Sequence, residues 1–178
     1  YKNTESILNE WNYLRGWTND FVYTIEAIHS IKGAAYFMSA LSLAQPSSAI
    51  DMMMYYDTRP SVFNGIFDFY TCRPLKGYLC MKWYGEFYDD YREVRAEMCP
   101  KDIYVLCGID KHGKITAIVT HYSENNEKEN VKIKLDFGRR CEFDVFLLDK
   151  DHDGELIKTT TNLTFDVPLY TCLKIKER

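Results

Sequence analysis

The feature that most constrains this sequence is a change of hydrophobic pattern near Cys99-Pro100. Before that point, apolar runs of strand length alternate with longer stretches whose apolar residues recur at helical spacing. After it, strand-length runs follow one another with only turns between them, which is typical of an antiparallel β-sandwich. The sequence therefore predicts an α/β part over residues 1–100 and an all-β part over residues 101–178.

The first part has the order βαβα. Ser6 to Glu10 forms the first expected strand, and Ala49 to Tyr56 is a nearly continuous apolar run, as expected for a parallel strand that is covered on both faces. Between them, apolar residues recur at helical spacing from Ile31 to Leu41, and Pro46 ends this helix because proline has no N–H to donate. A second amphipathic helix is expected to begin near Gly77.

The second part contains six expected strands. They cover Ile103 to Ile109, Ile115 to Tyr122, Val131 to Phe137, Glu142 to Leu148, Glu155 to Thr160 and Thr164 to Ile175. Asp and Gly at 111–114 and 149–154 predict hairpin turns. The second of these segments also matches the opening of a calcium-binding loop, but Thr160 stands where the bidentate Glu of such a loop is needed, so we expect a turn.

Charge and cysteine usage exclude several classes of protein. With 22 basic and 26 acidic residues, the net charge of −4 gives no electrostatic case for binding nucleic acid or an anionic membrane. No apolar run reaches the roughly 18 residues of a membrane span. The six cysteines form no CxxC pair and the four histidines lie far apart, so the sequence predicts no metal site and no cofactor.

The cysteines also bear on location. Several lie inside apolar runs, as Cys107 does, and buried free thiols fit a reducing compartment, so we expect a cytoplasmic protein. The chain opens on Tyr1 rather than methionine, which favours a piece of a longer protein. Aromatic residues make up 15% of the sequence, and rings with an apolar face and a polar tip suit both a core and a sugar-binding cleft.

Two βα units do not bury their own strands. Open strand edges with apolar faces need further parallel strands beside them, and a complete (β/α)8 barrel takes about 250 residues. Residues 1–100 hold about a quarter of such a barrel. We therefore expect a partner that covers the open strands, such as a second copy of the chain.

One carboxylate stands where barrel chemistry takes place. Glu10 ends the first expected strand and is followed by Trp11 and Asn12, while Tyr56 and Asp57 end the next parallel strand. Catalytic residues of α/β barrels come from these strand ends, and neighbouring strands lie about 4.8 Å apart, so the two groups are expected at one rim. From the pattern alone, Glu10 is either a catalytic carboxylate or a residue that caps a loop.

At these residues the chain resembles glycoside hydrolase family 39, which contains β-xylosidases and α-L-iduronidases. The resemblance covers most of residues 5–91, including the Asn9-Glu10-Trp11-Asn12 motif, the strand at 51–57 and the loop that leads into Pro74 to Tyr78. It implies a retaining hydrolase with a (β/α)8 barrel joined to a β-sandwich. This chain would supply the last two βα units of the barrel, strands seven and eight with their helices, and the accessory sandwich.

The resemblance also implies the role of Glu10. The family nucleophile ends the seventh strand in a Thr-Glu-Phe-Asn setting, whereas this chain has Asn at position 9, and an Asn-Glu pair is the usual mark of the acid/base on strand four. Only about 90 residues precede the sandwich, which is too few for four more barrel strands, so strand seven is the better assignment. Glu10 is then the nucleophile, and Trp11, Asn12, Tyr56 and Asp57 are the expected substrate contacts.

Two functions follow for testing. The first is a fragment of a retaining hydrolase acting on xylosides or related glycosides, inactive alone because the acid/base strand is missing. The second is a noncatalytic module, either carbohydrate-binding or purely structural, in which the helices serve as a packing layer.

Overall fold

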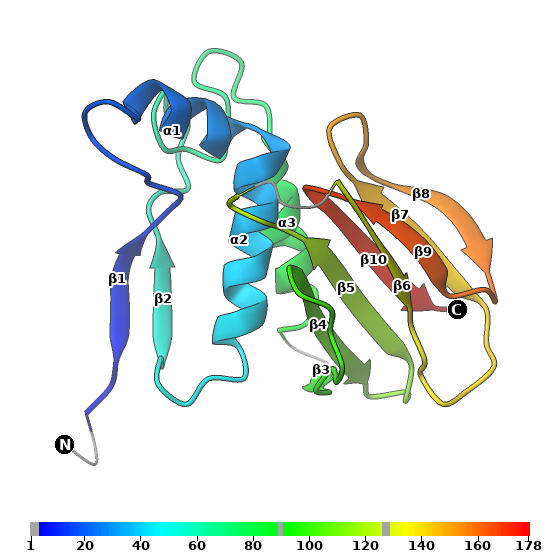
Figure 1. Cartoon of the computed structure of the whole chain (residues 1–178). Helices are drawn as coiled ribbons and strands as arrows, with labels where there is room; N and C mark the ends of the chain where they lie inside the picture. The colour runs from blue at the N-terminus through cyan, green and yellow to red at the C-terminus, as the bar shows by residue number, and fades with distance from the viewer. Residues whose placement is uncertain (1–3, 89–90, 126–128) are drawn as a thin grey trace.

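The computed structural model describes residues 4–88, 91–125 and 129–178. Figure 1 shows a parallel strand pair at one side, helices in the middle and antiparallel sheets at the other side. The elements of residues 4–88 run in the order β1 (Ile7–Trp11), α1 (Phe21–His29), α2 (Ile31–Ala44), β2 (Met52–Tyr55) and α3 (Lys76–Gly85). The remaining strands are β3 (Tyr91–Glu93), β4 (Ile103–Asp110), β5 (Ile115–His121), β6 (Asn130–Lys134), β7 (Phe143–Leu148), β8 (Asp153–Thr160), β9 (Thr164–Pro168) and β10 (Thr171–Glu177).

β1 and β2 form a two-stranded parallel sheet in which Trp11 lies opposite Tyr55. Met53 and Tyr55 pack toward the helices, whereas Met52 and Met54 on the other face are 46% and 45% exposed. The expectation that both faces of this strand are covered is therefore wrong for this chain. The reason is that α2 and α3 cover one face, and no described element covers the other.

The antiparallel part is built on a six-stranded sheet with the order β3-β4-β5-β10-β7-β8. The central strands alternate their side chains between two cores, as the pleat requires. On β5, Ile118 packs into the core formed with α2 and α3, while its neighbour Val119 packs into the core formed with β6 and β9. All residues of β5 are buried for this reason.

The second sheet contains β6 and β9, which cover part of the face opposite the helices. Val131 and Ile133 point into the core, and Lys132 and Lys134 into solvent, which is the alternation that the sequence predicts for a strand buried on one face. The sheets and helices together form three layers, so the sandwich shares its larger sheet with the helical part.

Several predicted elements differ from the observed ones. The single strand expected over 164–175 is wrong, because Pro168 ends β9 and Tyr170, with a φ of 59°, turns the chain into the other sheet as β10. The apolar run hides this turn, which contains no Gly or Asn. Sequence analysis also missed α1 and β3, the latter a three-residue edge strand paired with β4.

The two predicted hairpin turns are confirmed. Gly113 and Gly154 take φ values of 79° and 88°, which glycine adopts without strain. In the second turn, the carboxylate of Asp149 accepts hydrogen bonds from the backbone N–H groups of Asp151 and His152. This carboxylate therefore stabilises the loop itself, as Asp commonly does in turns.

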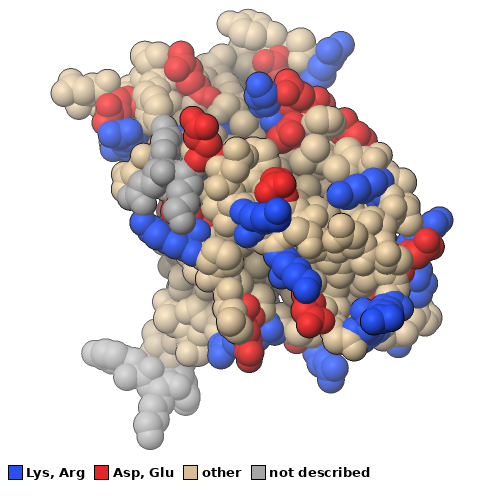
Figure 2. All heavy atoms as spheres, turned by 45° about the vertical axis from the view of Figure 1, so that its right-hand side comes forward, with Lys and Arg blue, Asp and Glu red and all other residues tan. Residues whose placement is uncertain are grey.

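Figure 2 shows basic and acidic side chains interspersed on the face it presents. This mixture agrees with the small net charge. Among the described residues, no helix combines the length and the apolar character needed to span a bilayer.

Candidate active site at the rim of the parallel strands

A cavity of about 320 Å³ opens where β1 ends. Two of the residues that line it are predicted site residues of β1 and the segment that follows, Glu10 and Asn12, and Tyr56 lines it from the end of β2. Trp11 also contributes to the wall. The structure thus brings four of the five predicted site residues to one cavity, as parallel strands that end at the same edge should.

Asn12 ties this rim together through four hydrogen bonds. Its Nδ2 donates to the carbonyl oxygens of Tyr56 and Asn64, at 2.6 and 3.2 Å. Its Oδ1 accepts from the backbone N–H of Tyr13 at 2.6 Å and from the hydroxyl of Tyr55 at 2.9 Å. These bonds use both donors and both acceptor sites of the amide, so Asn12 fixes the ends of β1 and β2 and the following loop relative to one another.

Burial separates the two tryptophans near the rim. Trp11 is 9% exposed, and its ring stacks on Phe37 at a centroid distance of 5.3 Å and meets Tyr55 edge-on at 5.2 Å. Trp17 is 65% exposed, lines the cavity and lies 5.2 Å from the ring of Phe63. Trp17 therefore presents an exposed ring to the cavity, whereas Trp11 belongs to the core beneath.

Glu10 is exposed, and no described residue forms an ion pair with it. The register of β1 shifts between Leu8 and Trp11, and Glu10, which lies in this irregular stretch, lines the cavity. Tyr56 is exposed beside it, and the Tyr56–Asp57 peptide bond is cis. Asp57 turns away from the cavity, and its carboxylate binds the guanidinium Nε of Arg59 at 2.7 Å.

Sequence reasoning missed the contribution of the loop after β2. Phe63 and Asn64 complete the cavity wall, and Gly65 lets the loop close on itself, because a Cβ there would collide with the carbonyl oxygen of Arg59. Asn64 also accepts a hydrogen bond from the backbone N–H of Asp57 at 3.2 Å. The Asn-Gly pair was the available signal, since it marks a tight turn at a rim position.

A second polar cluster joins this rim to the antiparallel sheet. Glu124 accepts hydrogen bonds from the hydroxyls of Tyr13, at 2.9 Å, and Tyr122, at 2.5 Å, and Lys32 lies 3.5 Å from its carboxylate. Lys32 is almost completely buried, and its ammonium donates to the hydroxyl of Tyr23 at 2.6 Å. The cluster is a hydrogen-bonded link between residues more than one hundred positions apart.

The cluster makes stability depend on pH. Partial burial by itself raises the pKa of Glu124, but the hydrogen bonds from Tyr122 and Tyr13 and the charge of Lys32 outweigh it, so the net pKa is lowered. A carboxylate with a lowered pKa in the folded state stabilises the fold above its ordinary pKa of 4.5 and loses that contribution as the pH falls through the folded value.

We therefore expect Glu124→Gln to destabilise the protein at pH 7 and to reduce the further loss of stability on acidification. Urea unfolding between pH 7 and pH 3 measures both effects. Glu26→Gln, at an exposed position of α1, is the matched control and should follow the unmodified chain. An acid-induced loss of the same size in Glu124→Gln and in the unmodified chain would contradict this assignment.

Comparison with known proteins gives the fold but no family. No protein-family model matches the sequence, and no curated protein matches it either. Among solved structures, the chain is similar to a GH30 endoxylanase from Clostridium papyrosolvens C71, with a TM-score of 0.66 and 11% identity over 99% of this chain. It is also similar to the catalytic domain of GH30 xylanase C from Talaromyces cellulolyticus, with a TM-score of 0.68, 12% identity and 99% coverage of this chain.

A GH51 arabinofuranosidase from Xanthomonas axonopodis pv. citri matches over 98% of this chain with a TM-score of 0.59 and 11% identity. The chain covers 42%, 41% and 41% of these three structures. Its fold is therefore like two fifths of a glycoside hydrolase structure. These proteins are assigned to families 30 and 51, so the resemblance to family 39 remains a prediction.

Proposed function

We propose that this chain forms part of the active site of a retaining glycoside hydrolase that acts on xylosides or related glycosides, with Glu10 as the nucleophile. The observation that carries the proposal is the position of Glu10. It is an exposed carboxylate at the end of a parallel strand, it opens on a cavity with Tyr56 and Trp17, and it lies in a fold shared with glycoside hydrolases. Carboxylates at such strand ends are the groups that attack or protonate sugars.

The bare face of β1 and β2 supports a larger barrel. Two parallel strands with exposed Ile7, Leu8, Met52 and Met54 do not make a stable sheet alone, because parallel sheets are buried on both faces. In the proposal, the chain supplies the last two βα units, and further strands lie beside β1 and β2. Glu10, which lines the cavity, would then face the barrel axis.

The remaining site residues take graded roles in the proposal. Tyr56 contacts the substrate directly, and Trp17 and Phe63 give a surface on which a sugar ring stacks. Asn12, whose amide is fully hydrogen-bonded within the rim, meets the substrate only by van der Waals contact at the cavity wall, and Trp11 supports that wall from the core. The carboxylate of Asp57 is paired with Arg59, so Asp57 contacts a substrate only if that ion pair opens. The proposed ligand is a carbohydrate and the proposed location is the cytoplasm.

Retention of configuration requires two carboxyl groups about 5 Å apart. Among the described residues that line the cavity, Glu10 is the one carboxylate. The acid/base therefore lies outside this chain in the proposal. We accordingly expect the purified chain to show no turnover of an aryl β-xyloside, measured as release of the phenol.

The turnover assay and an NMR titration with xylobiose distinguish the hydrolase proposal from the noncatalytic module. Turnover that disappears in Glu10→Gln would contradict the assignment of the acid/base to another segment. Addition of xylobiose should shift the NMR resonances of Trp17 and Phe63 and leave those of Trp83 unchanged, because Trp83, a residue of α3, is buried in the core and does not line the cavity. Shifts confined to the antiparallel sheets would instead support the noncatalytic carbohydrate-binding module.

A further inference from the structure

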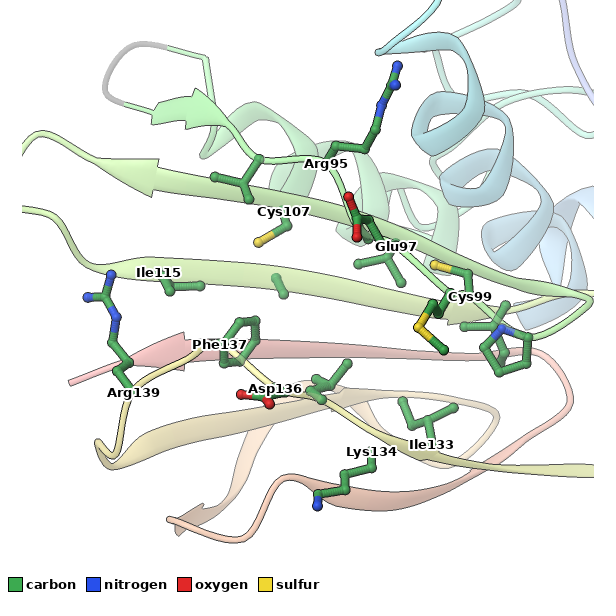
Figure 3. Close-up of a pocket in the computed structure, with 18 of the residues that line it drawn as sticks. Arg95, Glu97, Cys99, Cys107, Ile115, Ile133, Lys134, Asp136, Phe137 and Arg139 are labelled. Carbon is green, nitrogen blue, oxygen red and sulfur yellow. The ribbon is translucent and has the colours of Figure 1, made fainter.

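A second cavity of about 580 Å³ lies over β4 and β5, beside the end of β6 (Figure 3). Residues 94–100 form one wall and residues 132–139, which include the end of β6, form the other. The floor consists of apolar side chains of β4 and β5, among them Cys107, Ile115 and Ala117. We call this cavity the β6 groove. Its volume is within the range of pockets that hold specific ligands.

The β6 groove exists because the two sheets differ in width. The larger sheet has six strands and the smaller has two, β6 and β9, so the smaller layer ends at β6 while the apolar floor continues beneath it across β5 and β4. Among the described residues, β9 is the one strand paired with β6. The opposite edge of β6 is thus open and borders the groove.

The hydrogen-bond pattern shows which backbone groups of β6 face the groove. The N–H of Leu135 donates to Leu163, and Glu129 accepts from the N–H of Leu169, so odd-numbered residues bond toward β9. In an antiparallel pair, successive residues direct their N–H and C=O to opposite edges. Lys132 and Lys134 therefore direct their N–H and C=O to the open edge, where an added strand finds two donors and two acceptors.

β9 shows which side chains fit beside β6. Phe165 and Val167 lie opposite Ile133 and Val131 and point into the core, whereas Asp166 lies opposite Lys132 on the solvent side. A strand on the other edge of β6 meets the same alternation. It needs apolar residues over the groove floor and acidic residues beside the two lysines.

Charge favours the same partner. Four basic and two acidic side chains line the β6 groove, a local net charge of +2 in a chain whose net charge is −4. Arg139 is already paired with Glu177 at 3.3 Å, so the basic groups beside the open edge are Lys132 and Lys134. Lys134 extends away from the floor in Figure 3. Phe137 is the one aromatic ring among the described lining residues, which gives little surface for stacking a sugar.

We propose that the β6 groove binds an extended polypeptide strand of alternating apolar and acidic residues, which pairs with the open edge of β6. The added strand donates to and accepts from the backbone of Lys132 and Lys134. Its apolar side chains fill the space over β4 and β5, and its acidic side chains lie beside the two lysines. Strand addition of this kind draws affinity from the main chain and specificity from alternate side chains. This binding site does not include Glu10, so the proposal does not depend on the proposed hydrolase function.

Amide hydrogen exchange measured by NMR tests the proposal directly. A short capped peptide of alternating valine and glutamate, added at about 1 mM to detect weak binding, should slow exchange of the Lys132 and Lys134 amides about tenfold. The Val131 and Ile133 amides already face β9 and serve as internal controls whose exchange stays unchanged. The same peptide with alternate amide nitrogens methylated should have no effect, since it lacks the donors that pair with β6.

A charge swap tests the specificity. Lys132→Glu/Lys134→Glu alters two exposed side chains, so it should leave the fold intact while it abolishes protection by the valine–glutamate peptide and creates protection by a valine–lysine peptide. Equal protection by the methylated peptide, or none by either, would overturn the proposal. So would protection that rises with protein concentration in the absence of peptide, because a second copy of the chain would then be the occupant.

Discussion

Glu10→Gln in the complete protein encoded by this reading frame should lower kcat for an aryl β-xyloside by about 10⁴-fold or more, a loss typical of removing a nucleophile. The amide keeps the shape of the carboxylate but cannot attack the anomeric carbon. The measurement is steady-state hydrolysis, with the configuration of the first-formed product followed by NMR. Retention is expected, because a nucleophile paired with a separate acid/base forms a covalent intermediate.

Glu5→Gln provides the matched control for that experiment. Glu5 is an exposed carboxylate that lies just before β1, and it does not line the cavity. The kcat of the Glu5→Gln protein should equal that of the unmodified protein. An inverted product, or a Glu10→Gln protein with full activity, would show that the nucleophile has been assigned to the wrong residue.

Trp11→Ala should have the largest effect on folding, lowering the free energy of unfolding by about 3–5 kcal/mol. The ring fills the space between β1, β2 and α2, where it contacts Phe37, Tyr55 and Tyr36. Its removal leaves a cavity that these neighbours fill only in part. Because a domain of this kind is stable by only about 5–15 kcal/mol, much of the protein should unfold near room temperature in modest denaturant. Urea denaturation followed by circular dichroism measures the change.

Trp17→Ala separates a core role from a substrate role. This exposed ring should contribute less than about 0.5 kcal/mol to stability, but its loss should remove the xylobiose-dependent shift of Phe63. If Trp11→Ala unfolds at the same denaturant concentration as the unmodified chain, the ring of Trp11 is not part of the core. That result would make Trp11, rather than Trp17, the candidate for stacking on a sugar.

Much of the fold follows from periodicity along the chain. The helix expected from Ile31 to Leu41 is present as α2, and the run from Ile115 predicts β5 to within one residue. Both elements carry many apolar residues at one unambiguous spacing, so the pattern determines their type. The failures share a different property. β3 has three residues, and the turn at Tyr170 falls among the apolar residues from Val167 to Leu173 with no Gly or Asn to mark it, so neither leaves a periodic signal.

The sequence predicted that the candidate site residues lie at the ends of two neighbouring strands, but it did not predict how their side chains are arranged. The sequence shows neither the register shift in β1 nor which of its residues meets α2, so it could not assign Trp11 to the core and Glu10 to the cavity. Tertiary packing decides this, through the rings of Phe37 and Tyr55. The part played by Asn12 depends on bonds to residues about fifty positions away, and local sequence contains no record of them.

The six-stranded sheet has a consequence for how this protein can be divided. Leu106, Ile118, Leu148 and Cys172 belong to the core that the sheet shares with α2 and α3, although all four come from residues after position 100. Cutting the chain at that position would strip one whole face of the sheet of its cover. The antiparallel part is therefore not an independent module. The helices that pack on its larger sheet also pack on β1 and β2, so the position of the sheet and the position of the rim that carries Glu10 depend on the same core.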